Sequence, residues 1–179
     1  MDERSDGVTG EASYVPELCR IYVLMLLAAA AVGKAAGLSA FEGALENLIG
    51  LGARSARAVA LLVIGTEAGL ALLLLAGGRW AAAGMAGALL LLASFTAFVA
   101  VALARGAKVG CNCFGGAARP ISGYDVARNL IALGAGALYL ARGTGRPGLA
   151  PGELALLGLC ALILLLVTTS LGEIAELAR

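Results

Sequence analysis

Two cysteines separated by a single residue are the clearest candidates for chemistry in this sequence. They are Cys111 and Cys113, in the segment GCNCFGG over residues 110–116. Cysteines at this spacing can close a small, strained disulfide, and strain makes such a bond labile and suited to exchange. The flanking glycines supply the backbone freedom that a tight ring needs. The pattern therefore favours a redox pair.

Basic residues near the cysteine pair favour the thiolate, which is the reactive form of cysteine. They are Arg105, Lys108, Arg119 and Arg128. Three other interpretations stay open: two inert thiols, a static disulfide that staples a loop, or a thiolate site for a soft ion such as Cu(I). The chain has no histidine, and Cys19 and Cys160 are far away in the sequence. We predict no metal site, and we expect these two cysteines to pack as small apolar residues.

One carboxylate, Glu67, lies in the middle of a long apolar stretch over residues 58–78. An ionisable group in such a stretch is costly, and it is a candidate functional residue by default. It could stay protonated, carry protons, or pair with Lys34 or Arg128, and a purely structural ion pair explains it equally well. Lys34 lies near the end of its own apolar stretch, and we expect its side chain to reach toward the membrane surface.

Polar residues open the apolar stretch that follows the cysteines. Asp125 and Arg128 are one helical turn apart and are predicted to pair, after a helix cap at Ser122. Because Arg128 follows the cysteines closely, it is a candidate to stabilise a thiolate or to bind an anionic or quinone-like group, next to Asn129. Phe95 and Phe98 share one helix face, which fits core packing or a pocket wall.

The elements that carry these residues belong to a membrane protein. Of the 179 residues, 60% are apolar and 14% are charged, with a mean hydropathy of +0.92. Soluble domains are about half apolar and about a quarter charged, so this chain has more apolar surface than so small a volume can bury. The net charge of +1, from 13 basic and 12 acidic residues, gives no field for attracting nucleic acid, and we predict no such partner.

Five stretches are long enough to cross a bilayer as helices, which satisfy their own backbone hydrogen bonds. They cover residues of about 21–38, 58–78, 80–104, 122–141 and 153–172. We therefore predict an all-α, polytopic membrane bundle after a disordered polar segment over residues 1–16. Residues 41–52 have helical apolar spacing, which predicts a short amphipathic helix at the membrane surface or a continuation of the first span. Two glycine pairs, Gly33 with Gly37 and Gly65 with Gly69, have a spacing that predicts close approaches between helices.

The sequence from about residue 18 to 142 resembles the MauE family, within the DoxX-like group of four-helix membrane proteins. The most specific matches lie in residues 89–139, and they are Phe95-Thr96, Ala104-Arg105-Gly106, the Cys-Asn-Cys-Phe-Gly element at 111–115, Pro120, Ser122 and the run from Val126 to Leu130. The upstream matches are Lys34 followed by Phe41 and Leu45, and Glu67 followed by Gly69. The resemblance implies a four-helix domain over residues 17–142, with the span at 153–172 as an additional transmembrane helix.

The resemblance also implies a function. MauE proteins are implicated in maturing the disulfide-rich small subunit of methylamine dehydrogenase beside a thioredoxin-like partner, and DoxX relatives serve quinone-linked sulfur oxidation. Carried over by position, Cys111 and Cys113 are the redox pair, with Arg128, Asn129 and Glu67 as neighbours. The sequence itself requires no cofactor, and the resemblance implies a lipid quinone as a candidate, with Phe95 and Asn129 as the residues to hold it. Two alternatives remain: a non-enzymatic membrane assembly or transport factor, and thiolate metal handling.

The orientation in the membrane is inferred from redox chemistry. Disulfides form on the oxidising side of a membrane, so we expect the cysteine loop outside the cytoplasm and the N-terminus inside it. Basic residues are more numerous on the side of the cysteine loop, which mildly opposes this orientation. A cytoplasmic cysteine loop is the alternative.

Overall fold

The structure is a computed structural model that describes the backbone of residues 6–104, 123–143 and 149–177. The side chains of residues 6–13, 48 and 171–177 lie outside the described part. Within the described ranges the chain forms six α-helices and no strand. They are α1 (Asp6–Ala36), α2 (Leu38–Ile49), α3 (Ala53–Ala76), α4 (Gly78–Ala104), α5 (Gly123–Arg142) and α6 (Pro151–Leu177). The predicted all-α class is confirmed.

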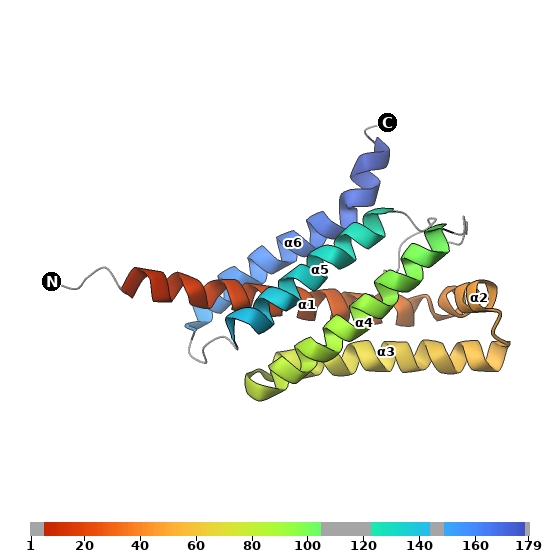
Figure 1. The fold of residues 1–179 in the computed structure, drawn as a ribbon, viewed down its shortest axis with the longest axis horizontal. Helices are drawn as coiled ribbons and strands as arrows, with labels where there is room; N and C mark the ends of the chain where they lie inside the picture. Colours follow the sequence, from red (N-terminus) through yellow and green to blue (C-terminus); the bar gives the residue numbers. More distant parts are fainter. Residues whose placement is uncertain (1–5, 105–122, 144–148, 178–179) are drawn as a thin grey trace.

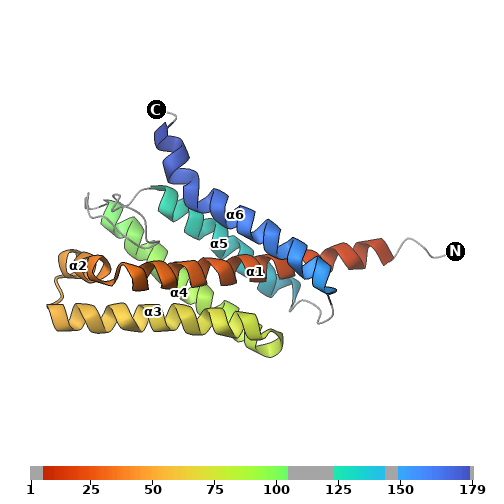
Figure 2. The same ribbon diagram turned by 180° about the vertical axis from the view of Figure 1, so that it is seen from behind.

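α1 is the central helix of the bundle. Figures 1 and 2 show it running between α3 on one side and α5 and α6 on the other, and it packs against all three. Of the 18 most apolar consecutive residues in each helix, 56% are buried in α1, against 17% in α3 and 22% in α4 and α6. The apolar core forms around Tyr22, Leu26 and Leu27 of α1. The other helices therefore present most of their apolar surface to the outside.

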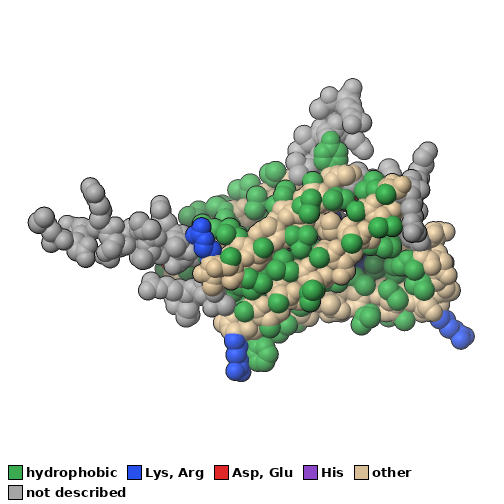
Figure 3. Space-filling model, viewed as in Figure 1, with side chains coloured by type: hydrophobic (Ala, Val, Ile, Leu, Met, Phe, Trp, Pro, Cys, Tyr) green, Lys and Arg blue, Asp and Glu red, His purple; other side chains and the backbone are tan. Residues whose placement is uncertain are grey.

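In the described part of the chain, four helices are long and apolar enough to cross a membrane, namely α1 from Tyr14 onward, α3, α4 and α6 up to Ser170. Large apolar side chains such as Leu62, Leu72 and Leu156 are exposed on their outer faces. Figure 3 shows apolar side chains over the middle of one face and basic side chains at its ends. A bilayer covers such an apolar belt, so the chain is a multi-pass membrane protein.

α5 forms where a span was predicted, but it is not one of the four most apolar helices. It is 20 residues long and carries Asp125, Arg128 and Arg142. At 1.5 Å per residue it is about 30 Å long, which matches the hydrocarbon thickness. α5 packs against α1 and α4 and also contacts α6, and Arg128 and Asn129 lie on its buried face. Its passage across the bilayer stays a prediction.

Two segments differ from their predicted bounds. α1 already begins at Asp6, so the prediction of disorder over residues 1–16 is wrong from residue 6 onward. Extending a helix that has already nucleated costs little, which explains how α1 continues beyond its apolar part. α6 extends from Pro151 to Leu177, beyond the predicted 153–172. Residues 41–52 largely form the predicted short helix, α2, which is separated from α1 at Gly37.

Glycines with positive φ make the tight connections on either side of α3. Gly50 ends α2 with φ 71° and ψ 28°, and its N–H donates to the carbonyl of Glu46 at 2.9 Å. Gly77 and Gly78, with φ of 76° and 54°, turn the chain from α3 into α4. Because side chains rarely tolerate these dihedrals, glycine allows these short connections between neighbouring helices.

α3 and α4 approach each other closely at Gly84. A Cβ atom at this position would lie 2.8 Å from the Leu73 Cβ and 3.2 Å from the Leu74 backbone nitrogen. By contrast, a Cβ at Gly65 or Gly69 would meet no atom within 4 Å in the described part of the chain. The close approach predicted from the Gly65 and Gly69 spacing is therefore wrong, because these glycines point away from the neighbouring helices.

We expect the substitution Gly84→Ala to destabilise the bundle by about 1–3 kcal/mol, because the added methyl group overpacks α4 against α3. The matched control is Gly69→Ala, which adds the same methyl group in open space on α3. Thermal unfolding of both variants in detergent checks this. Equal melting temperatures for the two variants would contradict the close packing at Gly84.

Candidate functional site

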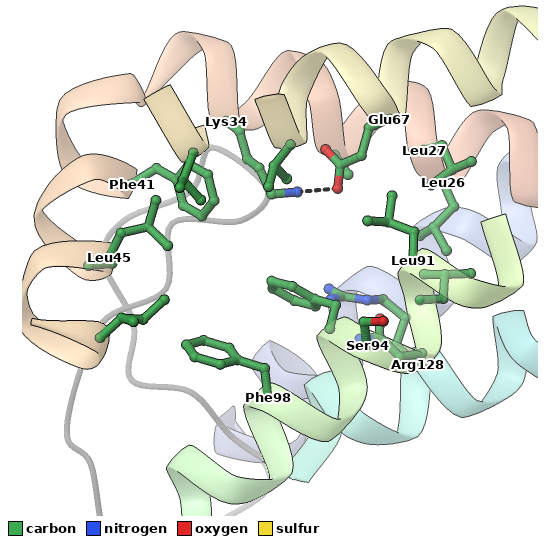
Figure 4. A pocket seen from close by; sticks show the side chains of 18 residues that line it. Leu26, Leu27, Lys34, Phe41, Leu45, Glu67, Leu91, Ser94, Phe98 and Arg128 are labelled. Carbon is green, nitrogen blue, oxygen red and sulfur yellow. Dashed lines mark hydrogen bonds and ion pairs between the residues drawn. The ribbon is translucent and has the colours of Figure 1, made fainter. Parts of the chain in front are cut away.

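A cavity of about 240 Å³ lies between α1, α2, α3, α4 and α5. Its wall is mostly apolar, with Leu26, Leu27 and Leu45 among its side chains (Figure 4). Five polar or charged side chains on four helices also line it. They are Lys34 of α1, Glu67 of α3, Ser94 of α4, and Arg128 and Asn129 of α5. This is the arrangement typical of a binding site, namely an apolar space with a few polar groups that converge on it.

A buried ion pair forms one wall of the cavity. The Lys34 Nζ donates to the Glu67 Oε1 at 2.6 Å, and the two side chains are 2% and 8% exposed. Figure 4 shows the two side chains meeting across the gap between their helices. The pairing of Glu67 with Lys34 is confirmed. The expectation that Lys34 reaches the membrane surface is wrong, because α2 folds back against α3 and brings Phe41 beside the amine.

Aromatic rings surround the Lys34 ammonium group. Its nitrogen lies 5.8 Å from the ring centre of Phe41 and 5.6 Å from that of Phe95. The rings of Phe95 and Phe98 are 6.5 Å apart, and both side chains line the cavity. Cation–π attraction of this kind is strongest where water is excluded. Both interpretations of Phe95 and Phe98 hold, because the two side chains line the cavity and also pack against the small core cluster of Val99 and Ala102.

α5 brings Arg128 and Asn129 to the same cavity. Both are nearly inaccessible, at 3% and 2% exposure. The Arg128 Nη1 lies 3.6 Å from the Asp125 Oδ1, which confirms the predicted pair. In Figure 4 the Arg128 side chain extends from α5 toward the space that holds Lys34 and Glu67. The structure thus unites four of the predicted site residues: Glu67, Arg128, Phe95 and Asn129.

Two buried polar atoms of the cavity wall have no hydrogen-bond partner among the described residues. They are the Glu67 Oε2, an acceptor, and the Asn129 Nδ2, a donor. Buried polar atoms nearly always have a partner, and an unmade bond costs about 1–3 kcal/mol. Water is scarce within a bilayer, so this cost is especially hard to avoid there. The two atoms are available to a further group in the cavity.

The predicted redox pair, Cys111 and Cys113, lies outside the described residues, as does Ser122. The segment that contains it connects α4, which ends at Ala104, to α5, which begins at Gly123. The remaining cysteines are free thiols. Cys19 packs against the main core as expected, whereas Cys160 is exposed on the outside of α6 and does not pack inside the bundle.

The structure also shows polar residues that sequence reasoning overlooked. Ser94 of α4 lines the cavity, and no pattern in the sequence singles it out. Arg20 pairs with Glu17 and donates to the carbonyl of Leu74 near the end of α3. The spacing of three residues between Glu17 and Arg20 was a usable signal for this pair.

The fold and the cavity define a class of protein: a polytopic helical membrane protein with a buried polar site inside its bundle. Residues 12–142 match the family described as Methylamine utilisation protein MauE. The chain is also 34% identical over 164 residues to the Methylamine utilization protein MauE of Paracoccus denitrificans, an alignment that covers 87% of this chain and 86% of that protein. The chain belongs to the MauE family, as the resemblance indicated. No solved structure matches it.

We expect the substitution Lys34→Met to destabilise the protein by about 3–5 kcal/mol, because it leaves the Glu67 carboxylate buried without its counter-ion. The double substitution Lys34→Met with Glu67→Met should recover most of this loss, since it removes both charges. Unfolding in detergent, measured for both variants and the unmodified protein, checks this. A double variant as unstable as the single one would contradict the pairing.

Proposed function

We propose that this protein is a membrane thiol–disulfide redox protein of methylamine utilisation, active in disulfide maturation of a partner such as the small subunit of methylamine dehydrogenase. Its membership of the MauE family and the name of its relative support the process. The observation that carries the chemistry is the Cys111-Asn112-Cys113 element. It stands in the connection between α4 and α5, two helices that supply the cavity with Phe95 and Arg128.

The proposed cycle consists of two balanced exchanges. In the first, a thioredoxin-like partner in its dithiol form transfers two electrons and two protons to the Cys111–Cys113 disulfide. The partner leaves as a disulfide, and the cysteines of this chain become a dithiol. In the second exchange, the dithiol transfers two electrons and two protons to an oxidant and becomes a disulfide again. In the first exchange a thiolate of the partner attacks one sulfur of the Cys111–Cys113 disulfide, and the partner's second thiol then resolves the mixed disulfide.

A lipid quinone is the oxidant that we propose, because it dissolves in the bilayer and accepts two electrons and two protons. The residues of the cavity fit such a group. Phe95 gives an aromatic wall, and Asn129 has a buried donor at its Nδ2 that has no partner among the described side chains. Lys34 and Arg128 also line this space, each next to a carboxylate, Glu67 and Asp125 respectively.

Thiol trapping tests the redox pair. In the background Cys19→Ser with Cys160→Ser, we expect Cys111 and Cys113 to change together between dithiol and disulfide at a potential between about −300 and −120 mV, the range of exchangeable protein disulfides. Mass spectrometry of the alkylated protein, equilibrated in a series of redox buffers, measures this. A pair that keeps one state across the whole series would refute the redox function.

Labelling from outside the cell tests the proposed orientation. The cells carry the same double-serine background, their outer layers are removed while the cytoplasmic membrane stays intact, and the cysteines are mildly reduced. A membrane-impermeant maleimide should then modify Cys111 and Cys113. The reason is that disulfide exchange belongs to the oxidising side of the membrane. Labelling that appears only after the membrane has been permeabilised would place the loop in the cytoplasm.

A further inference from the structure

We infer that the cavity binds a membrane-dissolved molecule with an apolar tail and a neutral head that both donates and accepts a hydrogen bond. The Glu67 Oε2 would accept from this head, and the Asn129 Nδ2 would donate to it. The inference deepens the proposed function, on which its role in the cell rests. All the residues that would form this binding site lie on α1 to α5.

The cavity opens on the apolar flank of the protein. Two of its lining side chains are exposed, Ile49 at the end of α2 and Ser94 on α4. Ser94 lies within the apolar helix Gly78–Ala104, which is long enough to cross a membrane. Its neighbour one turn earlier, Leu90, is 73% exposed, as expected for a side chain in contact with lipid. A molecule dissolved in the bilayer therefore reaches the cavity without passing through water.

The size of the cavity favours a head group over a whole ligand. Pockets that enclose a drug-sized molecule measure about 300–1,000 Å³. At about 240 Å³, this cavity has room for a polar head, while a tail extends past Ser94 into the lipid. The apolar side chains of Leu91 and Phe98 would flank the part where head and tail join.

The charges in the wall are already balanced, which favours a neutral head. Lys34 pairs with Glu67, and Arg128 lies 3.6 Å from the carboxylate of Asp125. An added charge would stay uncompensated in a medium that solvates ions poorly. A neutral hydroxyl or amide group adds hydrogen bonds without disturbing either pair.

The two atoms without partners specify the pattern of the head. A carbonyl oxygen satisfies the Asn129 Nδ2 but gives nothing to the Glu67 Oε2, which needs a hydrogen. A head with a hydroxyl or amide hydrogen and a separate oxygen satisfies both atoms. A quinol can satisfy both atoms, whereas its oxidised quinone, which has no hydroxyl hydrogen, can satisfy only the Asn129 Nδ2. A fatty amide can satisfy both atoms on an aliphatic frame. The site therefore selects for a donor hydrogen on the head.

Equilibrium binding to the full chain in lipid nanodiscs tests the inference. The probes are radiolabelled decyl-tailed benzoquinol, the matching benzoquinone and decanamide, under conditions that keep each in its redox state. We expect saturable binding of the quinol at least tenfold tighter than that of the quinone, the effect of about one buried hydrogen bond to a charged group. If decanamide binds as tightly as the quinol, the natural ligand is an aliphatic lipid such as a fatty amide. If decanamide binds more weakly, the natural ligand is an aromatic quinol. Equal affinity for quinol and quinone, or no saturable binding, would overturn the inference.

Two variants test whether the ligand binds in the cavity. Asn129→Leu keeps the size of the side chain and removes its donor, so quinol affinity should fall about tenfold. Ser94→Trp fills the exposed mouth and should abolish binding even if Asn129→Leu fails to fold. The matched control is Leu90→Trp, one turn earlier on the same exposed helix face, which should bind normally. Unchanged quinol binding in Ser94→Trp would overturn the inference.

The same measurements separate this inference from the redox function. All binding is carried out in the background Cys111→Ser with Cys113→Ser, so no electrons can pass between the cysteines and the probe. Tight quinol binding in this background supports the site whatever the outcome of thiol trapping. A redox-active cysteine pair without saturable binding would leave the proposed function standing and refute the site.

Discussion

The ion pair between Lys34 and Glu67 is the interaction on which the inside of this bundle depends. Each charge would be prohibitively costly alone in a medium without water, and their mutual attraction offsets that cost only at short range. The Nζ to Oε1 distance of 2.6 Å therefore restricts how α1 and α3 can lie along one another. The break at Gly37, directly after α1, lets α2 pack on α3 and shield the pair with Phe41.

The same constraint explains why polar residues gather around one cavity. Charged side chains such as Asp125 and Arg128 are costly in contact with lipid. α5 is therefore oriented so that these side chains lie toward α1 and α4. This rotation also brings Asn129 into the wall. Charge and hydrogen-bonding capacity are thereby concentrated at one place in an otherwise apolar protein. The connection from α4 to α5, which contains the cysteines, begins and ends on two helices of that wall.

The family match and the helical architecture divide the chain in a similar way. Residues 12–142 contain all of α2 to α5 and most of α1, which are the helices that build the cavity. α6 lies beyond this region and packs mainly on α1, where the Tyr22 hydroxyl lies 3.3 Å from that of Thr168. α6 thus covers the central helix on the side away from α3, and none of its side chains up to Ser170 lines the cavity.

Composition and apolar run length alone determined that this is a helical membrane protein, because a bilayer requires long apolar segments with internally bonded backbones. Local spacing also revealed the pair of Asp125 and Arg128, since residues one turn apart meet in any helix. Only the tertiary structure decided that Lys34 turns inward to Glu67 and that Gly84, not Gly65 or Gly69, lies at a close contact between helices. The rotation of each helix about its axis decides these contacts. In helices that are apolar nearly all round, the sequence carries little amphipathic signal to set that rotation.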